Sequence, residues 1–150
     1  MHDRILLPIE AHEGTDRAVE YGIELAKQND ATIHLLHVTE NLSSRGSFHE
    51  GSFGGDIDQD DLNERVLKRA REVLEPYIEK VEDAGIETVC KVTDGAPHKR
   101  ILAYAEESGV DVIVMGTRGR TGIGRPLLGG VTERVVRLSD VPVITIPLED

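Results

Sequence analysis

The sequence predicts an α/β protein in which a five-stranded parallel sheet carries helices on both faces. Short apolar runs with strand character alternate along the chain with longer segments of helical periodicity. This alternation is typical of parallel strands joined by right-handed crossovers. A glycine-rich loop also follows one buried strand and precedes a helix, which is where sheets of this kind bind ligands. The length of 150 residues fits a single domain that covers residues 1–150.

The first predicted strand is the apolar run RILLPIE, which covers residues 4–10. Pro8 stands near its carboxyl end, where the loss of a ladder hydrogen bond is tolerable. Small and apolar residues recur at helical spacing after Thr15, which we expect to be the N-cap of the first helix. Residues 31–39, ATIHLLHVT, then return to strand character and form the second predicted strand.

A long helix is the main element of the middle of the chain. The preceding segment, Asn41–Asp61, is rich in Ser, Gly and acidic residues, and we expect a mobile surface loop there. The helix begins at about Asp60 and ends at Gly85. Its apolar positions recur at helical spacing and are Leu62, Val66, Ala70, Val73, Leu74, Tyr77, Ile78 and Val81. Residues 86–92 form the third predicted strand.

Two further strands and two helices are expected in the last third of the chain. Pro97 lies near the first position of a helix that buries Ile101, Leu102 and Ala105. The run Val112–Met115 predicts a strand buried on both faces, and a helix resumes at Gly129-Gly130. Prolines near both ends of Val141–Pro147 indicate an edge strand. If the first strand is central and the fourth lies beside it, the strand order is 3-2-1-4-5.

The glycine-rich loop has a charge that differs from the rest of the chain. The formal net charge is −11, yet residues 112–132 contain no Asp or Glu and three arginines, Arg118, Arg120 and Arg125. Free backbone N–H groups at a helix N-terminus, together with guanidinium donors, favour a polyanion. The arrangement of strand, glycine loop and helix N-terminus therefore predicts a phosphate-binding site. The basic residues His98, Lys99 and Arg100 either face the same crevice or form a solvated turn.

Composition argues against several other classes of protein. The chain has no Trp, two Phe and three Tyr, and its net charge is negative, so no nucleic-acid partner is expected. We expect no membrane span, because no apolar run reaches the required length, and the amino terminus has neither signal-peptide nor transit-peptide composition. The expected location is cytoplasmic.

Cysteine and histidine give no metal-site pattern. Cys90 is the only cysteine, and its strand-like surroundings predict a buried structural thiol. His34 and His37 are three apart in a strand and are therefore expected on opposite faces. No HExxH or comparable spacing occurs among the six histidines, so the sequence predicts no metal site made by the protein alone.

The spacing of three loop glycines, Gly116-x2-Gly119-x9-Gly129, resembles the universal stress protein family, in particular its nucleotide-binding branch. The resemblance extends over nearly the whole chain. It includes ILLPIE, HLLHVTE, GAPHKRILAYAEESGVDVIVMGTRGRTG, LLGGVTERVVR and VPVITIP. It implies the same strand order, an adenine nucleotide alpha hydrolase-like fold, and a homodimer formed through the last strand, Val141–Pro147. Gly130 departs from the family pattern, which has Ser or Thr there.

The resemblance also implies a ligand and the residues that hold it. The ligand is ATP, with or without Mg²⁺. Pro8, Ile9, Glu10 and Val38 would border the adenosine, Met115 would cover the base, and Gly116, Arg118 and Gly119 would lie near the ribose and phosphates. Gly129, Gly130, Val131 and Thr132 would hold the phosphates. Glu10 is a second departure, because the family more often has Asp at that position.

Motifs that would indicate catalysis are missing from the sequence. The chain contains no GK[ST], no glycine fingerprint after its first strand, no SGG-x-DS and no HIGH. We therefore expect a stress-response or regulatory nucleotide-binding protein that is not an efficient enzyme. One alternative is a dimeric interaction module of the same family that binds no nucleotide. The other is a slow ATPase in which Glu133 or Asp94 positions a water molecule.

Overall fold

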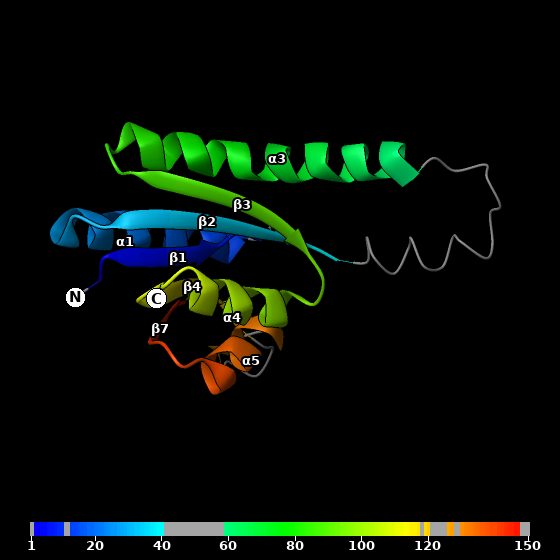
Figure 1. Cartoon of the computed structure of the whole chain (residues 1–150). Coiled ribbons are helices and arrows are strands. Elements are labelled where there is room, and N and C mark those ends of the chain that lie inside the picture. The colour runs from blue at the N-terminus through cyan, green and yellow to red at the C-terminus, as the bar shows by residue number, and fades with distance from the viewer. Residues whose placement is uncertain are drawn as a thin grey trace.

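The centre of the structure is a five-stranded parallel sheet (Figure 1). The computed structural model describes residues 2–10, 13–40, 59–117, 119–120, 126–127 and 130–147. The sheet strands are β1 (Arg4–Pro8), β2 (Thr32–Thr39), β3 (Thr88–Asp94), β4 (Val112–Gly116) and β7 (Val143–Ile146). Their order is β3-β2-β1-β4-β7, which confirms the predicted order 3-2-1-4-5. β7 is an edge strand, as its flanking prolines predict.

Helices cover both faces of the sheet, as expected. In the described ranges they are α1 (Glu13–Asn29), α3 (Gln59–Asp83), α4 (Pro97–Glu107) and α5 (Gly130–Leu138). α1 and α3 pack on one face, and α4 and α5 pack on the other. α3 precedes β3 in the chain, lies alongside it and extends past the end of the sheet (Figure 1). Along these stretches, no helix is both long and apolar enough to cross a membrane.

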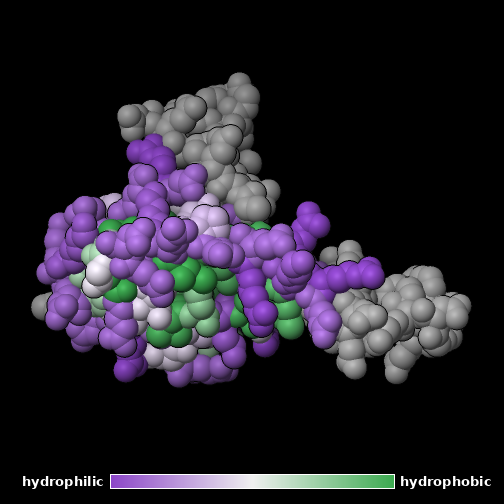
Figure 2. All heavy atoms as spheres, turned by 90° about the horizontal axis from the view of Figure 1, so that it is seen from above, coloured by the Kyte–Doolittle hydropathy of each residue, from purple (hydrophilic) through white to green (hydrophobic). Residues whose placement is uncertain are grey.

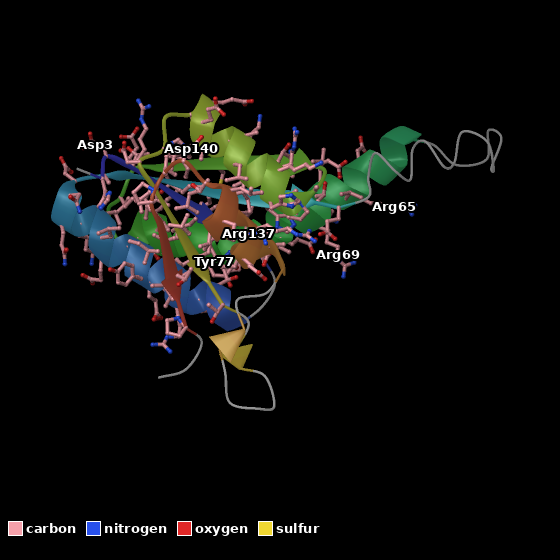
Figure 3. All side chains as sticks on the ribbon, turned by 90° about the horizontal axis from the view of Figure 1, so that it is seen from below. Asp3, Arg65, Arg69, Tyr77, Arg137 and Asp140 are labelled. Carbon is pink, nitrogen blue, oxygen red and sulfur yellow. The ribbon has the colours of Figure 1, made fainter. Side chains whose placement is uncertain are left out.

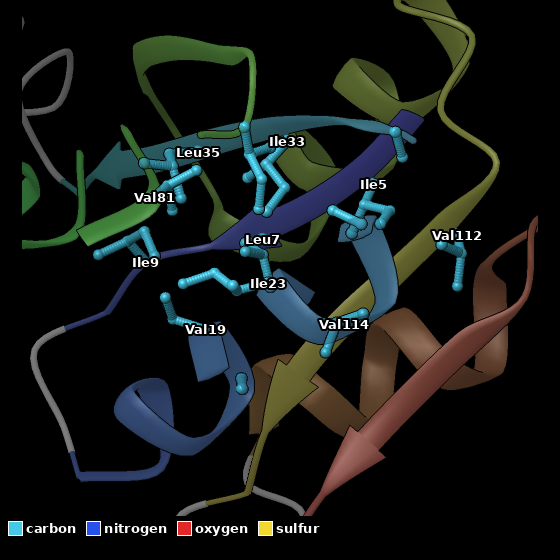
Figure 4. Close-up of a cluster of buried hydrophobic side chains, with 14 of the residues drawn as sticks. Ile5, Leu7, Ile9, Val19, Ile23, Ile33, Leu35, Val81, Val112 and Val114 are labelled. Carbon is cyan, nitrogen blue, oxygen red and sulfur yellow. The ribbon is translucent and has the colours of Figure 1, made fainter. Parts of the chain in front are cut away.

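The larger hydrophobic core lies between the sheet and the helices α1 and α3. Figure 4 shows it. Alternate strand residues, among them Ile5, Leu7, Ile33 and Leu35, point into it and are fully buried. The helices contribute Val19, Ile23, Leu74 and Val81, among others. The predicted apolar face of α3 is thus confirmed for Val73, Leu74, Tyr77, Ile78 and Val81, and Ala70 is buried as well.

The smaller core lies on the opposite face, under α4 and α5. Its strand residues include Leu6, Leu36, Ile113 and Met115, and its helix residues include Ile101, Ala105 and Val135. Because neighbouring residues of one strand enter different cores, β1 and β4 are buried on both faces. His34 reaches this side and hydrogen-bonds Tyr104 Oη through Nδ1 at 2.6 Å. His37 bonds Ile9 on the other side, which confirms the predicted opposite faces.

Two local predictions are wrong. Thr15 is not the N-cap of the first helix, because α1 already begins at Glu13. Thr15 is instead buried in the first turn, where Oγ1 donates to the Glu10 carbonyl oxygen at 2.7 Å. Cys90 is exposed rather than buried, because β3 is the last strand on its side of the sheet and only β2 flanks it. Partial burial still raises the pKa of the Cys90 thiol, and the charge of Glu82 adds to this.

The loops match the expectations only in part. Most of Asn41–Asp61 lies outside the described residues, and its last residues, from Gln59, begin α3. In the glycine-rich loop, β5 (Gly119–Arg120) pairs antiparallel with β6 (Pro126–Leu127), which the sequence does not predict. α5 begins at Gly130, in agreement with the predicted start of a helix at the last glycine pair.

Candidate functional site

The candidate site lies where the central strands end and three helices begin. β1 ends at Pro8 and β4 ends at Gly116, and these two strands are neighbours in the sheet. The carboxyl ends of parallel strands share one edge of the sheet, and in this topology β1 and β4 border the point where the strand order reverses. α1, α4 and α5 each start after a strand at this same edge. The topology therefore brings together residues that are far apart in the sequence.

Three predicted adenosine contacts share one face of the sheet. Val38 and Met115 both belong to the core under α4 and α5. Pro8 is buried and follows Leu6 by two residues, so it points to this face as well. Met115 is 3% exposed, and Val38 is partly buried. Together they form an apolar and largely buried end to three adjacent strands, and a flat base packs against residues of this kind.

Ile9 and Glu10 have different surroundings. The Ile9 side chain is 1% exposed in the core between the sheet and α1, and both of its backbone groups are used. Ile9 N–H donates to the Leu36 carbonyl at 2.7 Å, and Ile9 O lies 2.8 Å from His37 Nδ1. Ile9 therefore fixes the end of β1. Glu10 follows it, is half-buried, and accepts the Thr15 hydroxyl through its carbonyl oxygen.

Gly116 lies in close contact with the start of α1. A Cβ atom at Gly116 would stand 2.1 Å from the carbonyl oxygen of Gly14 and 2.5 Å from its carbonyl carbon. No side chain fits between these two backbones, because both are held by the strand and the helix. Gly116 is therefore required by the packing of α1 on β4.

The start of α5 is open as far as the described residues show. Gly130 is exposed, no described residue outside its own helix turn comes within 4 Å of where its Cβ would be, and its φ is outside the left-handed range. Val131 is partly buried against the core under α4 and α5. Thr132 is 4% exposed, and its Oγ1 donates to the Gly116 carbonyl at 3.3 Å. This bond connects the first turn of α5 to the end of β4.

The remaining predicted phosphate contacts lie mostly outside the described residues. Arg118 and Gly129 are among these, as is Arg125. Gly119 is described as part of β5. The structure therefore describes the first and middle glycines of the fingerprint, Gly116 and Gly119, whereas its last glycine, Gly129, lies outside the described residues.

Basic side chains of α4 and α5 lie near each other. The pKa of His98 is lowered mainly by partial burial and, to a smaller extent, by the positive charges of Arg134 and Lys99. Both cations are therefore close enough to act on His98. Lys99 and Arg100 are exposed, as a solvated basic turn requires, while His98 is half-buried. α4 begins after Ala96 without a side-chain cap and without acidic residues in its first turn. This part of the site therefore favours negative charge.

Several contacts at this edge of the sheet are not visible in sequence patterns. Thr39 Oγ1 donates to Asp94 Oδ1 at 2.7 Å, which joins the ends of β2 and β3. The contact of Gly14 with Gly116 joins segments about a hundred residues apart, and only the glycine type hints at it. Among the described residues, no group of three or more His, Cys, Asp or Glu is placed to hold a metal ion.

Comparison with known proteins identifies the family. The model of the universal stress protein family matches residues 1–147. The chain belongs to the universal stress protein family. Universal stress protein MJ0531 of Methanocaldococcus jannaschii is 29% identical over 146 residues, which are 97% of this chain and 82% of that protein.

Solved structures of this family have the same fold. That of MJ0577, also from Methanocaldococcus jannaschii, has a TM-score of 0.80 and 28% identity, and the match covers 100% of this chain and 99% of that one. A universal stress protein of Arabidopsis thaliana, solved with AMP bound, has a TM-score of 0.70 and 22% identity, covering 97% and 91%. The family resemblance read from the sequence is thus confirmed.

Proposed function

We propose that this universal stress protein binds adenine nucleotide, with ATP as its ligand, in the crevice between the ends of β1 and β4. The observation that carries the proposal is the pairing of an apolar surface with an open helix start. Pro8, Val38 and Met115 offer a surface for a base. The first turn of α5, beginning at the exposed Gly130, offers backbone N–H groups to phosphate oxygens.

The charges and the comparisons support the same ligand class. Residues 112–132 carry arginines and no acids in a chain of net charge −11. The related plant structure contains AMP, an adenine nucleotide. Mg²⁺ binds phosphate oxygens and keeps several waters, so it can accompany ATP without a dedicated set of protein ligands.

The proposed role is regulatory rather than catalytic. The relatives are named universal stress proteins, and the chain has none of the catalytic motifs of related nucleotide enzymes. Asp94, one candidate for positioning a water molecule, accepts the Thr39 hydroxyl and so has a structural role at the ends of β2 and β3. Glu133 lies in the first turn of α5 and is exposed. A slow ATPase is the second candidate, and it rests on that position of Glu133.

Equilibrium dialysis with ATP tests the proposal, with Gly130→Asp as the decisive variant. An aspartate at a helix start favours the fold, because it caps the helix and complements its dipole. The same charge repels phosphate. We expect saturable ATP binding by the unmodified protein, weaker at high salt, and a loss of at least about tenfold in Gly130→Asp without loss of stability. No binding by the unmodified protein would favour the interaction module that binds no nucleotide.

We also propose that two chains pair through β7. Ile113 N–H bonds Pro142 O at 3.0 Å and Thr117 N–H bonds Ile146 O at 2.9 Å, so these residues of the last strand face β4. The alternating residues Val143 and Thr145 therefore direct their backbone groups outward, where a second copy would add to the sheet.

The structure suggests a cleaner test of this dimer than a change at Ile144. Ile144 packs against the larger core, so a lysine there would also disturb the fold. Thr145→Pro removes one outward N–H and leaves the bonds to β4 intact. Light scattering should report a dimer for the unmodified protein and a shift toward monomer for Thr145→Pro. A mass of one chain for the unmodified protein would refute the dimer.

A further inference from the structure

The other edge of the sheet, β3, has an apolar groove beside it. The groove has a volume of about 420 Å³ and lies between α3 and β3. Leu67, Leu74 and Ile78 line it from the helix, and Cys90 and Val92 line it from the strand. Leu67 and Val89 are each 38% exposed, and they are two of the few large apolar side chains at the surface of the described residues. Figure 2 shows hydrophobic residues reaching the surface on the side of the molecule where α3 lies.

The outer edge of β3 has free backbone groups. Ile33 N–H bonds Glu87 O at 2.9 Å, and Gly95 N–H bonds Thr39 O at 3.0 Å, so these residues flanking β3 face β2. Backbone direction alternates along a strand, so Cys90 and Val92 direct N–H and C=O away from β2. In the part of the chain that the structure describes, neither residue has a hydrogen bond on that outer side. The groove thus runs beside an edge that can accept another strand.

One stretch of α3 next to this groove has a charge opposite to that of the whole chain. Residues 65–71 of α3, RVLKRAR, contain four cations and no acid, whereas the net charge is −11. Figure 3 shows Arg65 and Arg69 projecting from the half of α3 that extends past the sheet. Arg71 and Lys91 line the groove itself. Among the described residues, neither of these two has a carboxylate at ion-pair distance.

A second copy of this chain is a poor occupant of the edge. Lys91 is the central residue of β3, which runs from Thr88 to Asp94. Full antiparallel pairing of two β3 strands would place the two Lys91 side chains directly opposite each other, and like charges at that position are destabilising. A strand with an acidic residue opposite Lys91 would instead meet it with opposite charge.

We propose that the β3 edge and its groove bind an extended segment of a partner protein in which apolar and acidic residues alternate. The segment adds a sixth strand beside β3. Its backbone pairs with Cys90 and Val92, and its apolar side chains enter the groove under α3. Its carboxylates alternate to the other face of the sheet, where they meet Lys91. This surface lies at the opposite edge of the sheet from β7, and β2 separates β3 from the candidate nucleotide site at β1 and β4.

Two matched peptides test the proposal. The probe is a soluble peptide of about nine residues, a length that spans β3, with Val and Glu alternating between Gly-Ser ends. The second peptide has Lys in place of each Glu. NMR of the full chain should show slowed hydrogen exchange at the Cys90 and Val92 amides with the Glu peptide, and no change with the Lys peptide. Lys91→Glu should weaken binding of the Glu peptide roughly tenfold.

The controls separate this surface from general charge effects. Lys27→Glu changes an exposed lysine at the end of α1 and should leave binding of the Glu peptide unchanged. Equal binding of the two peptides, or binding of neither, overturns the proposal; in the second case Lys91 only keeps the edge from pairing. The proposal is also overturned if, without any peptide, hydrogen exchange at the Cys90 and Val92 amides slows as the protein concentration rises. The occupant of the edge is then a second copy of the chain.

Discussion

The two ends of the glycine-rich loop, Gly116 and Gly130, have opposite surroundings although both belong to one binding pattern. A side chain at Gly116 would collide with the backbone of Gly14, whereas a Cβ at Gly130 would meet none of the surrounding described residues within 4 Å. Gly116 is thus explained by the packing of the protein itself, and Gly130 leaves room for a ligand. A glycine in a nucleotide fingerprint is therefore not in itself a sign of contact with the nucleotide.

The largest effect is expected from Gly116→Ala. The added methyl group would lie 2.1 Å from the Gly14 carbonyl oxygen, so α1 and β4 would have to separate. We expect the free energy of unfolding to fall by about 3 kcal/mol or more, measured by urea denaturation followed by circular dichroism. ATP binding would fall only as the folded fraction falls.

Gly22→Ala is the matched control for Gly116→Ala. A Cβ at Gly22 would meet the far end of the Leu7 side chain at 2.9 Å, and that side chain can move. Alanine also gains about 1 kcal/mol of helix propensity over glycine. The change should therefore be near neutral. If Gly116→Ala and Gly22→Ala are equally stable, a clash with backbone costs no more than a clash with a movable side chain, and the account of Gly116 is wrong.

Gly130→Ser should tighten ATP binding by roughly tenfold. Serine keeps the backbone N–H and adds a hydroxyl donor for a phosphate oxygen, and about 1.4 kcal/mol of net gain corresponds to that factor. Strain does not oppose the change, because Gly130 is outside the left-handed region and its Cβ would have open space among the described residues. Titration calorimetry compares the two forms. Equal or weaker binding by the serine variant would mean that the phosphates do not reach Gly130.

The Thr132 hydroxyl donates a hydrogen bond that joins the two ends of the loop. Replacing Thr132 shows whether this hydroxyl serves the structure, a bound phosphate, or both. Thr132→Val removes the 3.3 Å bond to the Gly116 carbonyl and should cost about 1 kcal/mol of stability. Thr132→Ser keeps the hydroxyl and should restore most of it. Weaker ATP binding in the valine form alone would add a phosphate contact to this structural role. A valine form as stable as the unmodified protein would contradict the structural role.

The smallest effect comes from His34, which lies on β2 away from both ends of the loop. Burial first, and then the charge of Arg4, lower its pKa, while Glu87 acts in the opposite direction. The unfolded chain therefore binds this proton more readily than the folded one. Stability from His34 is complete above a pH of about 6.5 and falls as the pH drops toward the lower folded pKa.

The contribution of His34 to the free energy of unfolding is measured by urea denaturation at pH 7.5 and at pH 5.5. These values lie on either side of the ordinary histidine pKa of about 6.5. His34→Gln is the comparison, because glutamine does not titrate and can still bond Tyr104. The difference in stability between the two proteins should shrink at the lower pH. A difference that does not change with pH would show that His34 does not titrate differently on folding.

Much of the fold follows from sequence patterns because the patterns are local. The apolar run Val112–Met115 predicts a strand buried on both faces, and β4 is such a strand. Cys90 shows the limit, because its exposure depends on which strand forms the edge next to it, and a single run of residues does not carry that information.

The candidate site shows the same division. Its location at the ends of β1 and β4 follows from the alternation of elements and from the glycines. The contact of Gly14 with Gly116 and the bond of His37 to Ile9 depend on how distant segments meet, so they could be found only in the structure. Thr15 looked like a helix cap because its hydroxyl suits that role, but the hydroxyl bonds the Glu10 carbonyl instead.

The most direct test of the proposed function is a parallel titration of ATP and AMP into the unmodified protein. Both nucleotides offer the same base to Pro8, Val38 and Met115, so they differ only in the phosphates that reach the first turn of α5. We predict saturable binding of both, with ATP tighter than AMP by about tenfold or more. Equal affinities would contradict the phosphate role of the α5 N-terminus, and no binding of either would contradict the nucleotide site itself.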